Sequence, residues 1–235
     1  VGAGELILSS GTLTVSGAAS NVECSVAPVG DWPGGNPATA GFRFNSFGAV
    51  SGLIMNMQGG ALSTGTSGLF NVGAAGSNGT LNLSGGTVTV GTSGFNFPDA
   101  VNFAINLTGG ALLCAGPWTV QDSSDGDAPT WTAVSPSVVT FNAGGAQSIA
   151  HGGGNLGAAA FYGIAIGQGA TAPTVSLATD ITCNDFDVVE GTFAPGAGRS
   201  VTTTGASTSD IQAGGTLQVA GGTILKLAGG ATLDV

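Results

Sequence analysis

Three copies of one short phrase end the chain: Gly214-Gly215-Thr216-Leu217-Gln218-Val219, Gly221-Gly222-Thr223-Ile224-Leu225-Lys226-Leu227 and Gly229-Gly230-Ala231-Thr232-Leu233-Asp234-Val235. Each copy is a glycine pair followed by alternating apolar and polar residues, and similar phrases occupy residues 11–15 and 85–90. A single strand with one apolar face cannot bury that face until another copy lies on it. The repetition therefore predicts a stack of similar strands.

The spacing of the glycine pairs predicts the length of one turn of the stack. Pairs at 59–60, 85–86 and 109–110 are 26 and 24 residues apart, whereas the pairs that begin at 214, 221 and 229 are only 7 and 8 apart. Three short steps make one long step, which is the geometry of a three-faced parallel β-solenoid. We expect an all-β, right-handed solenoid of about nine coils. The alternative is a β-sandwich pilin completed by a donated strand, for which residues 1–15 are suited.

Composition supports a packed all-β protein and excludes two classes of partner. Apolar residues make up 42% of the chain and charged residues only 7%, so a core can form without long polar stretches. Arg43, Arg199 and Lys226 are the whole complement of Lys and Arg, against 13 acidic residues. Nucleic-acid binding needs cations that displace counterions, so we expect no nucleic-acid partner. The chain also lacks a long apolar run, so we expect no membrane insertion.

Two proline-rich segments interrupt the strand pattern. Residues 28–37 and 117–136 carry prolines and turn residues that do not suit central strands, so both are expected to be protruding loops. The second loop would separate N-terminal coils in residues 1–116 from C-terminal coils in residues 137–235, within one continuous domain. The tryptophans of these loops are candidate ligand-facing aromatic residues: Trp32, Trp118 and Trp131.

A family resemblance begins at residue 138. The sequence Val139-Thr140-Phe141-Asn142-Ala143-Gly144-Gly145-Ala146-Gln147-Ser148-Ile149 is followed by Phe161-Tyr162-Gly163-Ile164-Ala165-Ile166 and Val175-Ser176-Leu177-Ala178-Thr179-Asp180-Ile181-Thr182-Cys183. Over residues 138–205 the pattern resembles the β-solenoid repeats of bacterial adhesins and autotransporter-like surface proteins. The resemblance implies an extracellular solenoid that serves as a spacer, adhesive stalk or filament.

Neither end of the sequence looks like a capping segment. The strand patterns begin at Glu5 and run to Val235, so both terminal coils are expected to present open β-edges. The alternative is that flanking segments of a longer chain cover these edges. Different surfaces that join head to tail without closing produce a filament. The residues expected at this self-assembly contact are Leu6, Ile7, Leu8, Leu13, Val15, Leu225, Leu227, Leu233 and Val235.

Few residues suggest catalysis or metal binding. The carboxylates Asp122, Asp125 and Asp127 fall within six residues and form a candidate calcium site, with a polar loop tip as the alternative. The densest acidic stretch lies in residues 180–190, where the intervening apolar residues are expected to point inward and the acids outward. His151 follows Ala150 and precedes three glycines, which predicts an exposed loop residue. No cofactor other than calcium is indicated, and we expect no enzyme activity.

The cysteines and asparagines have structural interpretations. Cys24, Cys114 and Cys183 stand among apolar neighbours, so we expect buried thiols rather than metal ligands. Glycosylation sequons begin at Asn78, Asn82 and Asn106. Asn82 and Asn106 are one coil apart, which favours a ladder of stacked amides.

The function expected from the sequence is a structural subunit of an extracellular or cell-surface filament, with a second copy of the chain as its partner. One alternative is an adhesin or a phage tail-fibre-like appendage that binds surface glycans or a receptor. A weaker alternative is a polysaccharide lyase or hydrolase on the same fold.

Overall fold

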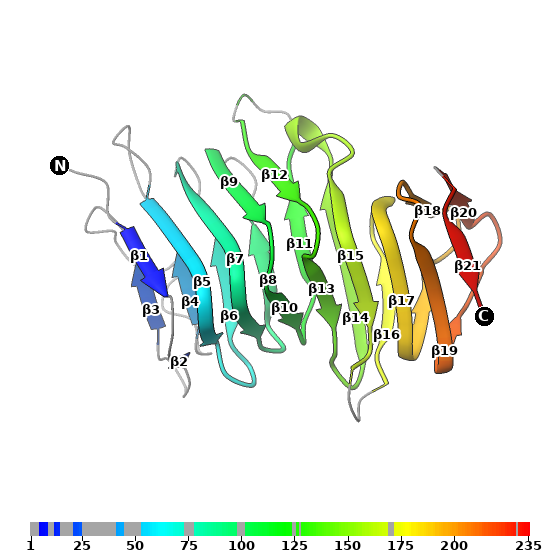
Figure 1. The fold of residues 1–235 in the computed structure, drawn as a ribbon, viewed down its shortest axis with the longest axis horizontal. Helices are drawn as coiled ribbons and strands as arrows, with labels where there is room; N and C mark the ends of the chain where they lie inside the picture. The colour runs from blue at the N-terminus through cyan, green and yellow to red at the C-terminus, as the bar shows by residue number, and fades with distance from the viewer. Residues whose placement is uncertain are drawn as a thin grey trace.

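The computed structural model describes residues 5–8, 12–14, 21–24, 41–44, 53–72, 78–97, 102–123, 126, 128–168, 172–228 and 230–235. These residues form strands joined in one sheet, and every pairing between named strands is parallel. One isolated antiparallel bridge, between Gly153 and Gly157, lies outside the named strands. The strands wind into a parallel β-solenoid of about seven turns, with almost no helix. Figure 1 shows β1 and β3 at one end of the stack and β20 and β21 at the other.

The strands stack in three main ladders. The first ladder contains β1 (Glu5–Leu8), β5 (Leu53–Ser63), β7 (Asn78–Val90), β9 (Asn102–Leu107) and β12 (Thr130–Ala133). The second ladder runs the length of the stack through β2 (Thr12–Thr14), β5, β7, β10 (Ala111–Cys114), β13 (Val138–Phe141), β15 (Ala160–Ile166), β17 (Ile181–Ala194), β19 (Thr208–Leu217) and β21 (Thr232–Asp234).

The third ladder completes the cross-section. It contains β3 (Asn21–Cys24), β4 (Gly41–Phe44), β6 (Leu69–Val72), β8 (Gly94–Phe97), β11 (Trp118–Gln121), β14 (Ala146–Gly152) and β16 (Thr174–Leu177), and continues onto the ends of β17 and β19. A shorter ladder joins β15 and β17 to β18 (Ser200–Thr203) and β20 (Ile224–Leu227). Parallel pairing on all sides rules out the β-sandwich alternative.

Glycine pairs mark corners of the solenoid, as their spacing predicts. Gly60, Gly86 and Gly110 have positive φ angles of 71°, 76° and 73°, a conformation that favours glycine. They also stack closely, because a Cβ added to Gly110 would lie 2.8 Å from the carbonyl oxygen of Gly86. The corner therefore requires glycine both for its backbone angle and for the close approach of the coil below.

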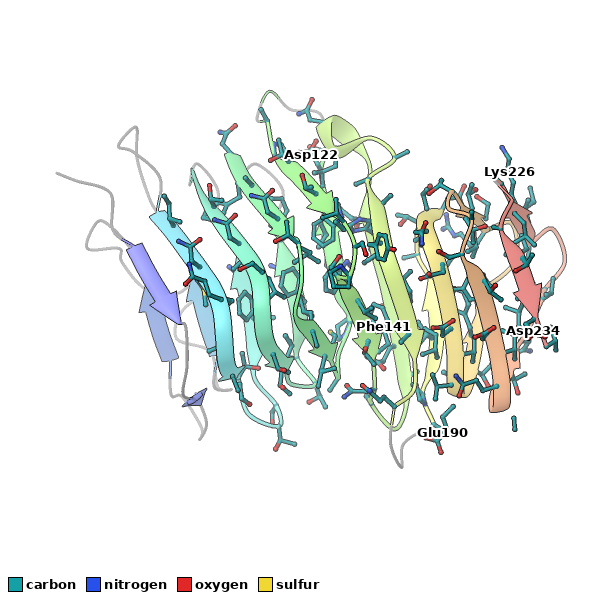
Figure 2. All side chains as sticks on the ribbon, in the orientation of Figure 1. Asp122, Phe141, Glu190, Lys226 and Asp234 are labelled. Carbon is teal, nitrogen blue, oxygen red and sulfur yellow. The ribbon has the colours of Figure 1, made fainter. Side chains whose placement is uncertain are left out.

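The core is a continuous column of inward-pointing side chains. Strands of the middle coils alternate buried and partly buried residues, as in the pattern exposed-buried-intermediate-buried-intermediate-buried of β9. Aromatic rings stack along the third ladder, with ring centroids 5.3 Å apart for Phe70 and Phe95 and 4.5 Å apart for Phe95 and Trp118. Phe141 lies within this interior, where Figure 2 labels it. Burial of these rings, together with that of the aliphatic core residues, stabilises the fold.

The turn count corrects one expectation. About nine coils were expected and the structure has about seven turns. The advance is uneven near the N-terminus, where Glu5 of β1 pairs directly with Ile54 of β5. Two coil lengths of sequence lie between these neighbouring strands, so the chain does not advance by one layer every 25 residues.

The second predicted loop is also corrected. Residues 117–136 contain β11 and β12, so the solenoid continues through this segment instead of being divided by it. Its prolines lie outside the strands, at 117, 129 and 136, and therefore leave the strand N–H groups available. The other predicted loop, residues 28–37, lies outside the described residues.

Candidate functional site

The C-terminal end of the stack is more exposed than the middle coils. Among the described strands, β20 pairs only with β18 and β21 pairs only with β19, so each has one edge without a strand partner. From residue 210 to the end, no described residue is fully buried. Figure 2 shows Lys226 and Asp234 on these last strands. We call the outer edge of β19, β20 and β21 the C-terminal edge.

Apolar side chains at the C-terminal edge lack the cover that inner coils have. Leu217, Leu225 and Leu233 are only partly buried, although they pack against the core cluster. In contrast, Val201, which stands directly under Leu225, is 1% exposed. The inward-facing residues of the last coil are thus covered on one side only. Large apolar side chains exposed on the same coil are Val219, Ile224, Leu227 and Val235.

Backbone donors also point out of the C-terminal edge. The N–H groups of Ile224 and Ala228 donate to the carbonyl oxygens of Arg199 and Thr203 in the preceding coil. Alternate N–H groups of a strand point to opposite sides. Those of Leu225 and Leu227 therefore face away from β18, and a further strand would satisfy them.

The strands at the N-terminal end also have few described partners. β1 and β2 pair only with β5, and β3 pairs only with β4, within the described part of the chain. Of the predicted self-assembly residues, Leu6, Ile7 and Leu8 lie on β1 and Leu13 lies on β2, whereas Val15 lies outside the described residues. At the other end, Leu225 and Leu227 lie on β20, Leu233 lies on β21 and Val235 ends the chain. The structure therefore divides the predicted contact residues between the two ends.

The three tryptophans proposed to face a ligand differ in their placement. Trp118 is fully buried on β11, and its Nε1–H donates a 3.3 Å hydrogen bond to Nδ1 of His151. Trp131 is partly buried against the core, and its Nε1–H donates to the carbonyl oxygen of Ala160 at 2.8 Å. The expectation that Trp118 faces a ligand is wrong, because its ring is fully buried in the aromatic interior. For Trp131, which is only partly buried, the expectation stays a prediction. Trp32 lies outside the described residues.

His151 is buried rather than exposed. It lies on β14, is 3% exposed, and its ring centroid is 4.2 Å from that of Phe161 and 4.7 Å from that of Trp131. Burial lowers the pKa of His151 to about 3, so the imidazole is neutral. Nδ1 accepts from Trp118, which places the proton on Nε2, and Nε2 is buried with no hydrogen-bond partner. Of the three glycines that predicted a loop, Gly152 is the last residue of β14, and Gly153 and Gly154 follow the strand. His151 therefore lies within the strand.

The candidate calcium site is described only at Asp122. This carboxylate is buried at the end of β11, and its Oδ2 accepts the backbone N–H of Asn155 in the 3-10 turn η1 (Gly154–Leu156). Asp125 and Asp127 lie outside the described residues, so the calcium site stays a prediction. Among the residues that the structure describes, no group of three or more His, Cys, Asp or Glu side chains is placed to hold a metal ion.

A lateral groove of about 470 Å³ crosses several coils beside Asp122. Its polar lining includes Asp180, whose Oδ1 accepts the N–H of Ser200, and Thr179, whose hydroxyl bonds to the backbone of His151. These groups already connect neighbouring coils. At Thr179 and Asp180 the groove lining therefore holds neighbouring coils together.

The acidic stretch and the cysteines follow the predicted alternation. Phe186 and Val188 are buried, whereas Asp185 and Asp187 between and beside them are partly exposed. Burial raises the pKa of both carboxyl groups, and the neighbouring carboxylate of Asp210 adds to the rise. Cys114 and Cys183 are free and fully buried, and burial raises their thiol pKa values to about 11 and about 12. For Cys24, on β3, the prediction of a buried thiol stays untested.

The predicted asparagine ladder is confirmed. Asn82 Nδ2 donates to Asn56 Oδ1 at 2.7 Å, and Asn106 Nδ2 donates to Asn82 Oδ1 at 2.8 Å. A second pair, which the sequence analysis missed, joins Asn96 Nδ2 to Asn71 Oδ1 at 2.5 Å. The signal for it was present, because these asparagines are 25 residues apart, the length of one coil.

In the described part of the chain, no helix is long and apolar enough to span a membrane. No protein-family model, curated protein or solved structure matches the chain.

Proposed function

We propose that the protein is a structural subunit that assembles head to tail, through its terminal coils, into an extracellular or cell-surface filament. The observation that supports this most is the C-terminal edge, where strands with outward-facing N–H groups carry partly covered leucines. A second coil placed on this edge would pair those donors and bury Leu217, Leu225 and Leu233. Both backbone pairing and apolar burial favour such an addition.

The parallel ladders make the contact repeatable. The second ladder runs in one direction from β2 to β21, so β2 of a second copy can continue it without reversing a strand. A contact between two different ends leaves the same two ends free on the product. Growth therefore continues, and the product is a filament rather than a closed dimer.

The glycan-binding alternative has less support. Its proposed stacking platforms included Trp118 and Trp131, but Trp118 is fully buried and Trp131 is partly buried against the core. The polysaccharide-enzyme alternative needs two carboxylates facing a sugar. The acids of β17 instead lie on the outer face of a strand, beside hydrogen-bonded asparagine and serine side chains.

The test is light scattering after size-exclusion chromatography, together with negative-stain electron microscopy, across a range of protein concentrations. We expect concentration-dependent growth into long, uniform filaments. Leu227→Lys is expected to weaken association at least about tenfold, because a charge in the contact would have to be desolvated. A protein that stays monomeric at every concentration would overturn the proposal.

The same strand offers a matched control. Leu227 stands above the buried Thr203, in an inward column, whereas Ile224 stands above Ser200 on the outer face. Ile224→Lys makes the same chemical change without placing the charge between coils, so we expect filaments to persist. Circular dichroism of both variants checks that the solenoid remains folded. Equal loss of assembly in both variants would show that stacking through the interior is wrong.

A further inference from the structure

One column of residues connects the two ends of the solenoid without a break. In the second ladder, Thr14 of β2 pairs with Ser63, and the register continues from strand to strand until Asp210 pairs with Asp234 of β21. The members of this column, which we call the end-to-end column, are Thr14, Ser63, Thr89, Leu113, Thr140, Ala165, Asp187, Asp210 and Asp234.

The chemistry of the end-to-end column changes along its length. Hydroxyl residues occupy the N-terminal layers, and carboxylates occupy the last three, at Asp187, Asp210 and Asp234. The backbone N–H of Asp210 donates to Asp187 Oδ1 at 3.2 Å, which partly compensates the crowded charges. Like charges directly opposite one another on neighbouring strands are unfavourable. The next layer is therefore better filled by a hydrogen-bond donor than by another acid.

The flanking positions of the two terminal strands also correspond. β2 reads Thr12-Leu13-Thr14 and β21 reads Thr232-Leu233-Asp234. Thr232 already stacks on Thr208, with a 2.9 Å hydrogen bond between their hydroxyl groups. Leu233 is partly buried against the core, which marks its position as inward. If a strand with the pattern of β2 were shifted by one residue along β21, its leucine would lie opposite Thr232 or Asp234 instead of Leu233. The alternation of polar and apolar residues therefore fixes the register.

We propose that β2 of a second copy of this chain stacks in parallel on β21, with Thr14 on Asp234, Leu13 on Leu233 and Thr12 on Thr232. This inference rests on the proposed function and gives its contact a defined register. The end-to-end column then continues from the carboxylates of one copy into the hydroxyl residues of the next. A threonine there brings a donor to the last carboxylate of the stack. The hydroxyl stack of Thr208 and Thr232 extends in the same way.

Cysteine cross-linking tests the register. The test variant carries Thr14→Cys and Asp234→Cys. Cys24→Ser removes a cysteine on a neighbouring strand of the first coil. Cys114 and Cys183 are fully buried and are kept. Neighbouring strands lie about 4.8 Å apart, which falls within the Cα separation that a disulfide accepts. Oxidation of the two thiols by diamide should produce a ladder of covalent dimers, trimers and longer species on a non-reducing gel.

Two controls make the result specific. Each single-cysteine variant lacks one partner and should not form the ladder. Thr14→Cys combined with Lys226→Cys keeps a cysteine on the last coil but places it on β20, in a different ladder, so it should not form the ladder either. A ladder from this second pair would show that the coils are rotated relative to each other.

The outcomes separate this inference from the function on which it rests. Filaments seen by electron microscopy without cross-linking of Thr14→Cys to Asp234→Cys would overturn the register and leave head-to-tail assembly standing. Dimers that stop growing would point to a two-fold contact between identical ends and would overturn the head-to-tail register. The absence of any association would overturn the proposed function itself.

Discussion

Asn82 and Asn56 occupy the same outward column one coil apart, and the side-chain amide of Asn82 donates to Asn56 Oδ1 at 2.7 Å. Asn82 Oδ1 in turn accepts from Asn106, so Asn82 is the middle of a three-residue amide ladder parallel to the solenoid axis. The side-chain hydrogen bonds of the ladder connect three successive coils, in addition to the backbone hydrogen bonds between each neighbouring pair of strands. Its energetic contribution can be measured separately from that of the core.

Replacing Asn82 with alanine removes two hydrogen bonds at once. We expect a loss of about 1–2 kcal/mol in the free energy of unfolding, because both neighbouring amides lose a partly buried partner. Denaturant titration followed by circular dichroism measures it. Thr132→Ala is the control, since Thr132 pairs with Asn106 in the same column but is exposed. A loss in Asn82→Ala no larger than in the control would show that the ladder does not stabilise the fold.

Corner glycines should tolerate no side chain. Gly110→Ala combines a φ of +73° with a Cβ placed 2.8 Å from the carbonyl oxygen of Gly86, so we expect destabilisation of about 1–3 kcal/mol. Gly145→Ala is the control, because its added Cβ meets nothing within 4 Å and its φ is not positive. We expect that variant to change stability by less than about 0.5 kcal/mol. Similar melting temperatures for both variants would contradict the stacked-corner argument.

His151 should make the fold sensitive to mild acid. Its pKa falls from 6.5 to about 3 on folding because of burial, so between these values the unfolded chain takes up a proton that the folded chain does not. Stability from this group is complete above pH 6.5 and is lost as the pH falls. Between pH 7.5 and 5.5 we expect a loss of about 1.4 kcal/mol. His151→Phe keeps a ring in the cluster and should remove that part of the pH dependence, as measured by denaturant titration at each pH.

The contribution of Asp187 to stability should change with pH in the direction opposite to that of His151. Burial, then the charges of Asp185 and Asp210, raise its pKa, so the folded state binds a proton more readily than the unfolded chain. The unfavourable contribution is present above the raised pKa and is relieved as the pH falls toward 3.8. Asp187→Asn keeps the oxygen that accepts the Asp210 N–H. We expect it to stabilise the fold at pH 7 by up to about 0.5 kcal/mol, since the group is half exposed.

The matched control for Asp187 is Glu190→Gln, which neutralises an acid of the same strand outside the end-to-end column. Thermal melts at pH 7 and pH 3.5 should separate the two variants only at the higher pH. A gain in Asp187→Asn that persists at pH 3.5 would mean that the carboxylate's charge is not the cause.

Several structural features follow from residue spacing alone. Glycine pairs 24 and 26 residues apart predicted corners, and Gly60, Gly86 and Gly110 occupy them with positive φ angles. Asparagines one coil apart predicted the ladder of Asn82 and Asn106. The sequence suffices in these cases because residues that are one coil length apart along the chain lie next to each other on neighbouring coils of a solenoid. Alternation likewise placed Phe186 inward and Asp187 outward on β17.

Other placements depended on the fold as a whole. The sequence around Trp118 and His151 contains prolines and glycines, which predicted loops, yet both side chains lie in one aromatic cluster formed by β11, β12, β14 and β15. These distant residues meet only if each intervening turn of the solenoid contains the right number of residues. Local composition does not contain that information. The functional expectation for Trp118 failed for this reason.

The sequence by itself determined the all-β stacked architecture, its corners and its outward amide ladder. These features depend on spacings that recur from one coil to the next and are visible along the chain. Only the tertiary structure decided that Thr14 and Asp234 belong to one column. That relation sums the register of every intervening strand pair, including the direct contact of β2 with β5 across a long stretch of chain. Register is fixed by packing in three dimensions, and a single coil of different length would have moved Asp234 to another column.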